Sequence, residues 1–272
     1  MKIVICAKRD LVSATALNVL LAGLEERHNV MIILSDKVNP AERSLPQAQD
    51  FVFYERDLAI DLMFSLLDEN DQHGELLTFE ALEKKYNAPL YVLGNINDEK
   101  NVELVKTWQP DLLLSIRYNY LFKQAILDSV KRATLNLHPG LLPHYAGMYA
   151  PFHALNHGEP SLGCTLHYID DEAIDAGEII STAQYSADMG QSVMHHFEQC
   201  YRLGMGLILQ AVGEFENNVK PASKKQNLDD KKYFSYPTTE EFNEFSDKGG
   251  VLITHGELLS ALKKYLPADY TH

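Results

Sequence analysis

The sequence predicts an α/β protein with a mostly parallel twisted sheet and helices on both faces. Short apolar runs of strand length alternate with longer amphipathic segments, an alternation typical of βαβ units. The short runs are apolar at consecutive positions, which indicates strands buried on both faces, as in parallel sheets. The chain has 272 residues, a length that suits one large domain with a small appendage.

The elements can be placed from these runs in chain order. Strands are predicted over residues 2–7, 30–36, 89–94, 111–117, 133–138, 164–169 and 178–185. Helices are predicted over 15–27, most of 57–86, 101–108, 123–130 and 193–215. In the last helix, apolar residues recur at 193, 197, 200, 201, 205, 208, 212 and 215, the spacing of one helical face. Thr78 has the position of a helix N-cap, and Pro110 ends the helix before it.

Beyond residue 217 the sequence becomes polar and reads as a surface connection. Two capping-box patterns follow, Thr238 with Glu241 and Thr254 with Glu257, and each indicates the start of a short helix. We therefore expect a main domain over 1–220 and a small helical appendage over 221–272.

Composition limits the class of partner and the compartment. The net charge of −14 argues against nucleic acid, because phosphate binding needs a basic surface. The three cysteines are far apart and form no CxxC pair, which favours free thiols in a reducing compartment. No apolar run has the length of a membrane span or a signal peptide. We expect a cytoplasmic protein with no membrane partner.

Several common sites are missing from the sequence. The first strand is followed by CAKRDLVSATA, which has no glycine, so a dinucleotide-binding loop is disfavoured. No GxSxG motif indicates an α/β-hydrolase. The segment HALNH (153–157) lacks the glutamate of the HExxH zinc motif, and we expect no metal site.

Asn136, His138 and Asp175 form the best candidate for a catalytic group. Strand side chains alternate, so the Asn-x-His spacing places both side chains on one face, at the carboxyl end of the strand 133–138. A carboxylate from the segment 170–177 can orient the imidazole, and an amide can donate to a developing oxyanion. Such a group suits acyl transfer without a protein nucleophile. On spacing alone, a structural histidine at the strand end is an equal alternative.

The segment NLHPGLLPHYAG (136–147), followed by GCTLHYIDDEAIDAGEII (163–180), resembles the N10-formyltetrahydrofolate-dependent formyltransferases. That family has an Asn-x-His before a Leu-Leu-Pro loop and an Asp-x-Gly after the next strand. The resemblance extends over roughly residues 1–215 and implies that 1–220 is a formyltransferase catalytic domain.

The resemblance also implies roles. Asn136 and His138 would polarise the formyl carbonyl, and Asp175 would hold His138 in its useful protonation state. Binding of N10-formyltetrahydrofolate as co-substrate is implied for two loops, whose residues are Tyr118, Tyr120, Leu121, Phe122, Asp170, Asp171, Glu172 and Ala173.

The acceptor amine is the least defined part of the prediction. The stretches SIRYNYLFKQAIL and TFEALEKKYNAPLYVLGNIND look similar to the branch that formylates nucleotide-linked amino sugars, which is our first choice of acceptor. The loop PHYAGMYAP departs from that family by lacking an arginine before its glycine. Candidate acceptor-binding residues are Lys8, Arg9, Arg117, Tyr145, Tyr149 and Phe152. Alternatives are phosphoribosylglycinamide formylation, hydrolysis of the formyl folate and a non-enzymatic folate-binding subunit. A homodimer is also expected.

Overall fold

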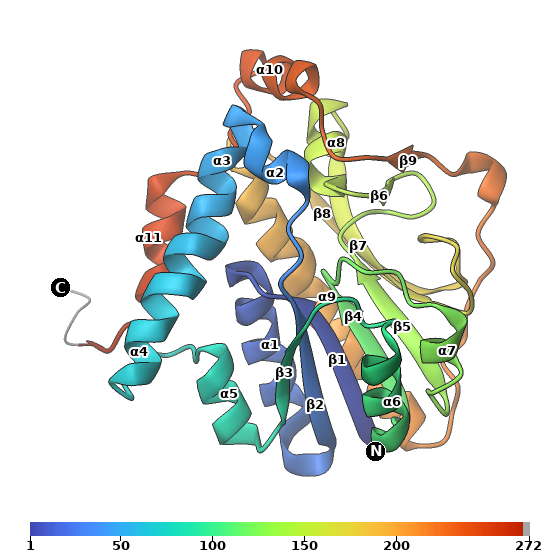
Figure 1. Ribbon diagram of the computed structural model, residues 1–272. Coiled ribbons are helices and arrows are strands. Elements are labelled where there is room, and N and C mark those ends of the chain that lie inside the picture. The colour runs from blue at the N-terminus through green and yellow to red at the C-terminus, as the bar shows by residue number, and fades with distance from the viewer. Residues whose placement is uncertain (269–272) are drawn as a thin grey trace.

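The computed structural model describes residues 1–268, and its centre is a seven-stranded sheet in the order β3-β2-β1-β4-β5-β7-β8 (Figure 1). The strands are β1 (Lys2–Lys8), β2 (Asn29–Ser35), β3 (Leu90–Leu93), β4 (Leu112–Ile116), β5 (Ala133–His138), β7 (Ser161–Tyr168) and β8 (Ile179–Ser186). The first five of these pair in parallel, whereas β7 and β8 are antiparallel. The prediction of a mostly parallel sheet is confirmed.

Helices cover both faces of the sheet. They are α1 (Leu11–Leu24), α5 (Phe79–Tyr86), α6 (Glu99–Trp108), α7 (Gln124–Leu127), α8 (Ala150–Asn156) and α9 (Val193–Glu216), with a short 3-10 turn at Glu25–Arg27. Ile3 and Ile5 of β1 belong to the large cluster with α1 and α9, whereas Val4 and Cys6 belong to a smaller cluster with α6 and α7. This alternation explains why the strand is apolar at every position.

The segment 57–86, predicted to be mostly helical, is interrupted between residues 69 and 79, and the predicted helix N-cap at Thr78 is confirmed. The extended Leu45 separates α2 (Pro40–Ser44) from a continuous helical segment that consists of α3 (Pro46–Val52), the π-helix η2 (Phe53–Phe64) and α4 (Ser65–Glu69). The polar stretch after α4 leaves the helix at Asp71, where φ is 50°. A new helix, α5, begins where Thr78 accepts a hydrogen bond from the amide of Ala81.

The C-terminal region packs into the same core as the sheet. Both predicted capping boxes are present, at the starts of α10 (Thr239–Asp247) and α11 (His255–Lys263). Side chains from this region in the large cluster are Tyr236, Phe242, Phe245, Leu258, Ala261, Leu262 and Tyr265. α11 lies beside η2, because His255 is hydrogen-bonded to Tyr54 and the ring centroid of Tyr265, just after α11, is 4.7 Å from that of Phe64 (Figure 1).

A second, two-stranded sheet joins distant parts of the chain. β6 (Ala146–Gly147) pairs in parallel with β9 (Tyr233–Phe234), which follows a 3-10 turn, η3 (Leu228–Asp230). None of the helices within residues 1–268 has the length and apolar character to cross a membrane.

Candidate active site

A cavity of about 610 Å³ lies at the carboxyl ends of the central strands. Lys8 ends β1, Arg117 follows β4 and His138 ends β5, and all three line the cavity. The chain proceeds outward from β1 in both directions, so the sheet order reverses between β1 and β4. Open α/β sheets bind ligands in the crevice that forms at such a point.

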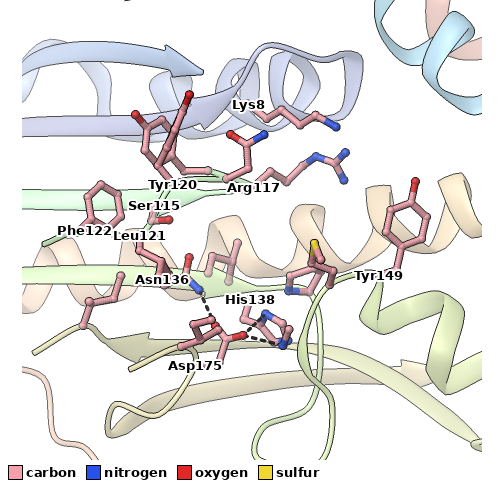
Figure 2. Close-up of a pocket in the computed structure, with 18 of the residues that line it drawn as sticks. Lys8, Ser115, Arg117, Tyr120, Leu121, Phe122, Asn136, His138, Tyr149 and Asp175 are labelled. Atoms are coloured by element: carbon pink, nitrogen blue, oxygen red, sulfur yellow. Dashed lines mark hydrogen bonds and ion pairs between the residues drawn. The ribbon is translucent and has the colours of Figure 1, made fainter. Parts of the chain in front are cut away.

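The cavity brings together Asn136, His138 and Asp175 (Figure 2). Nδ1 of His138 lies 3.5 Å from Oδ2 of Asp175, and Nδ2 of Asn136 lies 3.4 Å from Oδ1 of the same carboxylate. The side chains of His138 and Asp175 are only 4% and 9% exposed, so their interaction is weakly screened by water. The arrangement provides an amide donor and an imidazole–carboxylate pair within one enclosed space.

The surrounding backbone fixes the carboxylate of Asp175. The backbone of Asp175 has φ of 47°, a left-handed conformation that is uncommon outside glycine. The amide of Gly147 donates to Oδ2 at 2.8 Å. Burial alone would raise the pKa of Asp175, but His138, His167 and the Gly147 amide lower it by more. The net pKa lies well below the usual range, so Asp175 is a carboxylate at neutral pH.

Both ring nitrogens of His138 face acceptors. Nε2 donates to the carbonyl of Tyr145 at 2.5 Å, while Nδ1 faces Asp175. At 3.5 Å, the Nδ1 contact is longer than an ordinary hydrogen bond. This nitrogen therefore remains the one that can exchange a proton with a bound molecule in the cavity.

His167 is a further member of the group that the sequence analysis missed. The antiparallel register of β5 and β7 pairs it with Asn136. Nδ1 of His167 donates to the carbonyl of Tyr168 at 2.8 Å, so Nε2 accepts from Nδ2 of Asn136 at 3.0 Å. The available signal was a histidine within an apolar strand just before the Asp175 loop. His167 orients the amide of Asn136.

Residues implied in folate binding lie along one side of the cavity. Figure 2 shows Tyr120, Leu121 and Phe122 on the opposite side of His138 from Tyr149. The predicted residues that line the cavity are Tyr118, Tyr120, Leu121, Phe122, Asp171, Glu172 and Ala173. Asp170 is not among the lining residues. Tyr118 stacks on Phe122 with centroids 5.4 Å apart, which gives this side an aromatic wall.

The predicted acceptor-binding residues are divided between the cavity and other places. Lys8, Arg117 and Tyr149 line the cavity. Arg9, Tyr145 and Phe152 do not. Arg9 pairs with Asp61 at 2.5 Å on the surface. The Tyr145 hydroxyl donates to Glu159 at 2.7 Å, and Phe152 is fully buried. Several further residues line the cavity that were not predicted from the sequence, and they include Lys37, Glu42, Phe197, Tyr201, Tyr233 and Tyr236.

The two cavity cations from the sequence analysis are already paired with carboxylates. Arg117, which has φ of 56°, donates to Asp10 at 2.8 Å and to Glu55 at 2.7 Å. Lys8 lies 3.3 Å from Glu42. Burial raises the pKa of Glu55 to about 7, although Arg117 opposes the shift. Burial alone would also raise the pKa of Asp10, but Arg117, Lys8 and the Ser13 amide lower it by more, so the pKa lies below its usual value.

Comparison with known families then places the chain. A sequence model described as formyl transferase matches residues 66–212, more than half of the protein. The chain belongs to the formyl transferase family. The match includes Asn136, His138 and the loop around Asp175, whereas Lys8, Asp10 and Glu55 lie before it and Tyr233 lies after it.

Curated relatives match parts of this chain. Methionyl-tRNA formyltransferase of Fusobacterium nucleatum is 22% identical over 177 residues, 64% of this chain and 56% of that protein. The bifunctional polymyxin resistance protein ArnA of Wigglesworthia glossinidia brevipalpis is 33% identical over 128 residues, 46% of this chain and 19% of that protein. The chain spans about half the length of the first curated relatives it matches.

Solved structures of formyltransferases share the fold. An N-formyltransferase from Helicobacter canadensis, in complex with folinic acid and dTDP-3-aminofucose, has a TM-score of 0.60 at 16% identity, covering 94% of this chain and 85% of its own. Glycinamide ribonucleotide transformylase 1 from Symbiobacterium toebii has a TM-score of 0.57 at 17% identity, covering 84% of this chain and 94% of its own.

No group of three histidine, cysteine, aspartate or glutamate residues within 1–268 is arranged to hold a metal ion. The polar groups of the cavity are instead arranged as donors, acceptors and ion pairs. This chemistry suits transfer of a neutral acyl group.

Proposed function

We propose that this protein is an enzyme that transfers a formyl group from N10-formyltetrahydrofolate to a primary amine. The observation that carries the proposal is the buried group of Asn136, His138 and Asp175, which lines one cavity in a member of the formyl transferase family. Two solved proteins of the same fold were crystallised with 5-N-formyl-THF or folinic acid, which supports a formyl folate as the co-substrate.

The site residues fit the charge changes of this reaction. The acceptor nitrogen forms a bond to the formyl carbon while the bond from that carbon to N10 breaks. Asn136 Nδ2 would donate to the carbonyl oxygen as it becomes negative, in a cavity with little competing water. Because Nε2 of His138 already donates to Tyr145, Nδ1 of His138 would donate to this oxygen in the imidazolium form of the ring. One proton leaves the amine and one proton reaches N10, so the transfer is balanced. Asp175 would stabilise the imidazolium of His138 during this proton movement.

Our first choice of acceptor is the amino group of a nucleotide-linked sugar. Support comes from neighbours described as sugar N-formyltransferases and from the aromatic residues Tyr149, Phe197 and Tyr236 that line the acceptor side of the cavity. The net charge of −14 disfavours a tRNA acceptor, despite the tRNA formyltransferases among the relatives. Lys8 and Arg117 remain the predicted partners of the diphosphate, which would have to compete with Glu42, Asp10 and Glu55 for them.

A second candidate acceptor is glycinamide ribonucleotide. The fold similarity to the Symbiobacterium toebii transformylase favours it. Action in the cytoplasm and assembly as a homodimer stay predictions, as does the role of the region 221–272 in acceptor binding.

The experiment is a formyl-transfer assay with N10-formyltetrahydrofolate against dTDP- and UDP-linked amino sugars and glycinamide ribonucleotide. Turnover of one nucleotide sugar is expected. If only glycinamide ribonucleotide is formylated, the proposed reaction stands and the proposed acceptor is wrong. Formate release at the same rate without any amine would indicate a hydrolase and contradict the proposal.

A His138→Ala variant tests the proposed role of the site. The loss of an oxyanion donor and proton carrier should lower kcat by about 10³-fold or more, with folate binding retained. Unchanged turnover in a folded His138→Ala protein would remove His138 from the mechanism.

A further inference from the structure

The segment that follows α9 contacts both loops that carry the catalytic group, and its residues Tyr233 and Tyr236 line the cavity. We call residues 220–236 the C-terminal strap. It contains β9, which lies beside β6 in Figure 1. The family match ends at residue 212, so the strap lies outside it.

The strap holds the backbone of the Asp175 loop. Nε2 of Gln226 donates to the carbonyl of Asp175 at 3.2 Å and to the carbonyl of Gly177 at 2.7 Å. Nζ of Lys231 donates to the carbonyl of Ile174. Nearer the start of the strap, Lys224 forms two backbone hydrogen bonds of 2.8 Å each with Ile179.

The other end of the strap holds the loop after β5. The amide of Ala146 donates to the carbonyl of Lys232 at 3.0 Å, and the amide of Met148 donates to the carbonyl of Phe234 at 2.9 Å. Between these two anchor points, the amide of Gly147 is aimed at Oδ2 of Asp175. The strap therefore acts on Asp175 from two directions, through its backbone and through its carboxylate.

The orientation of the Gln226 amide follows from its partners. Two carbonyl oxygens face the same side-chain atom, so that atom must be the nitrogen, whose two hydrogens are both used. Asp175 needs such an anchor because its left-handed backbone, with φ of 47°, costs free energy unless the surroundings fix it. Only a double donor at position 226 can satisfy both carbonyls.

We propose that Gln226 is a positioning residue for catalysis, and that the C-terminal strap is part of the catalytic machinery through it. Gln226 fixes the strained backbone of Asp175, and the carboxylate of Asp175 then faces His138. This inference rests on the proposed function, because it takes Asp175 as the carboxylate that supports formyl transfer. It means that a segment outside the family match affects the rate of formyl transfer.

The test compares Gln226→Glu with Gln226→Ala in the full chain. Glutamate keeps the shape of the side chain, but when ionised it places an acceptor against two carbonyls. We expect kcat to fall about 10- to 100-fold in Gln226→Glu, with the KM of both substrates and the Tm nearly unchanged. A protonated carboxyl group can donate one of the two hydrogen bonds, so the activity of Gln226→Glu relative to wild type should recover in part as the pH falls from 8 toward about 4.5, near the ordinary pKa of glutamate.

The matched control is Gln210→Glu, the same change at an exposed position of α9 away from the cavity. It should keep kcat and show no pH-dependent recovery. A second readout needs no turnover: the carboxyl carbon of Asp175 is followed by NMR. Gln226→Ala should raise the pKa of Asp175 toward its ordinary value, because the carboxylate leaves its donors.

The outcomes separate the two proposals. If wild type transfers formyl groups and Gln226→Glu does so equally well at every pH, the inference is wrong and the proposed function stands. If Gln226→Glu lowers both the Tm and the activity, and the activity does not recover at low pH, the strap has only a structural role and the inference is also wrong. If wild type is inactive on every acceptor, the proposed function fails, and the Asp175 titration still decides whether Gln226 positions that residue.

Discussion

Three residues that line the cavity have a left-handed backbone conformation without being glycine. They are Arg117, Tyr149 and Asp175, with φ of 56°, 54° and 47°. Each such residue costs about 1–3 kcal/mol and persists only where its neighbours fix it. Arg117 is held by two carboxylates, and Asp175 is held by Gly147 and Gln226. The geometry of the site is thus maintained against a local cost in stability.

His167 allows a test of how the Asn136 amide is oriented. Replacing His167 by alanine removes the acceptor that receives Nδ2 of Asn136 at 3.0 Å, so the amide can rotate away from the formyl oxygen. We expect kcat to fall about 10- to 100-fold, the effect of one mispositioned hydrogen bond in an enclosed site. His144→Ala, at an exposed histidine that does not line the cavity, is the control. Equal steady-state rates for both variants would contradict the role of His167.

Glu55 makes the stability of the protein depend on pH in a direction opposite to that of Asp175. The pKa of Glu55 is about 7 in the folded chain, against an ordinary 4.5, because the side chain is buried. The folded state therefore binds this proton more tightly, and stability falls as the pH rises from 4.5 toward 7. The pKa of Asp175 is instead lowered on folding, so its contribution is present above its ordinary pKa and is lost in acid.

Glu55→Gln should remove the first of these dependences. Across this pH window the variant should gain stability relative to wild type, by on the order of 3 kcal/mol, since one pKa unit corresponds to about 1.4 kcal/mol. Urea unfolding of both proteins at several pH values between about 4 and 8 measures the gap. A gap that stays constant with pH would show that Arg117 keeps Glu55 ionised throughout.

At the scale of elements, the sequence predicted what local patterns determine. Seven strands, the Asn-x-His face of β5 and both C-terminal capping boxes depend on residues a few positions apart. What it missed depends on pairing between distant segments. His167 reaches Asn136 only through the antiparallel register of β5 and β7, and Arg117 meets Asp10 across 107 positions. Local periodicity contains no information on either contact.

The pairing of β6 with β9 depends on a glycine. Gly147 has φ of 96°, and a Cβ at this position would overlap the carbonyl oxygen of Phe234. Gly147→Ala should therefore separate the two strands, move its amide away from Asp175 and lower both Tm and kcat. Gly158→Ala is the matched control, because its φ of 74° carries a similar strain in open space. It should cost only about 1 kcal/mol and leave kcat unchanged. Equal effects of the two variants would mean that the overlap with Phe234 does not matter.

At the scale of the whole molecule, the loops that carry His138 and Asp175 and the region after α9 form one structure. The strap contacts both active-site loops, and the helices beyond it complete the large hydrophobic cluster. Tyr265 is fully buried, and its hydroxyl lies 3.0 Å from the hydroxyl of Thr15 in α1. Packing therefore links the C-terminal helices to the first helix of the chain.

This packing predicts that a chain ending at residue 236 does not fold stably, although it keeps every residue of the strap. The removed segment includes Phe242, Phe245, Leu258, Leu262 and Tyr265, all buried in the core. Each large buried side chain contributes about 1.5–3 kcal/mol, so their loss is comparable to the whole stability of a domain, about 5–15 kcal/mol. Circular dichroism during heating should show no cooperative transition for the shortened chain.

Point variants on α11 test the same packing in the full-length protein. Leu262→Ala removes a side chain that is 8% exposed and should cost about 2–4 kcal/mol, whereas Leu259→Ala, on the same helix at 57% exposure, should cost under about 1 kcal/mol. A cooperative transition of the shortened chain near the wild-type Tm, or equal costs for the two leucines, would show that α11 is dispensable. The region after residue 220 would then be an appendage in the energetic sense as well as in the sequence.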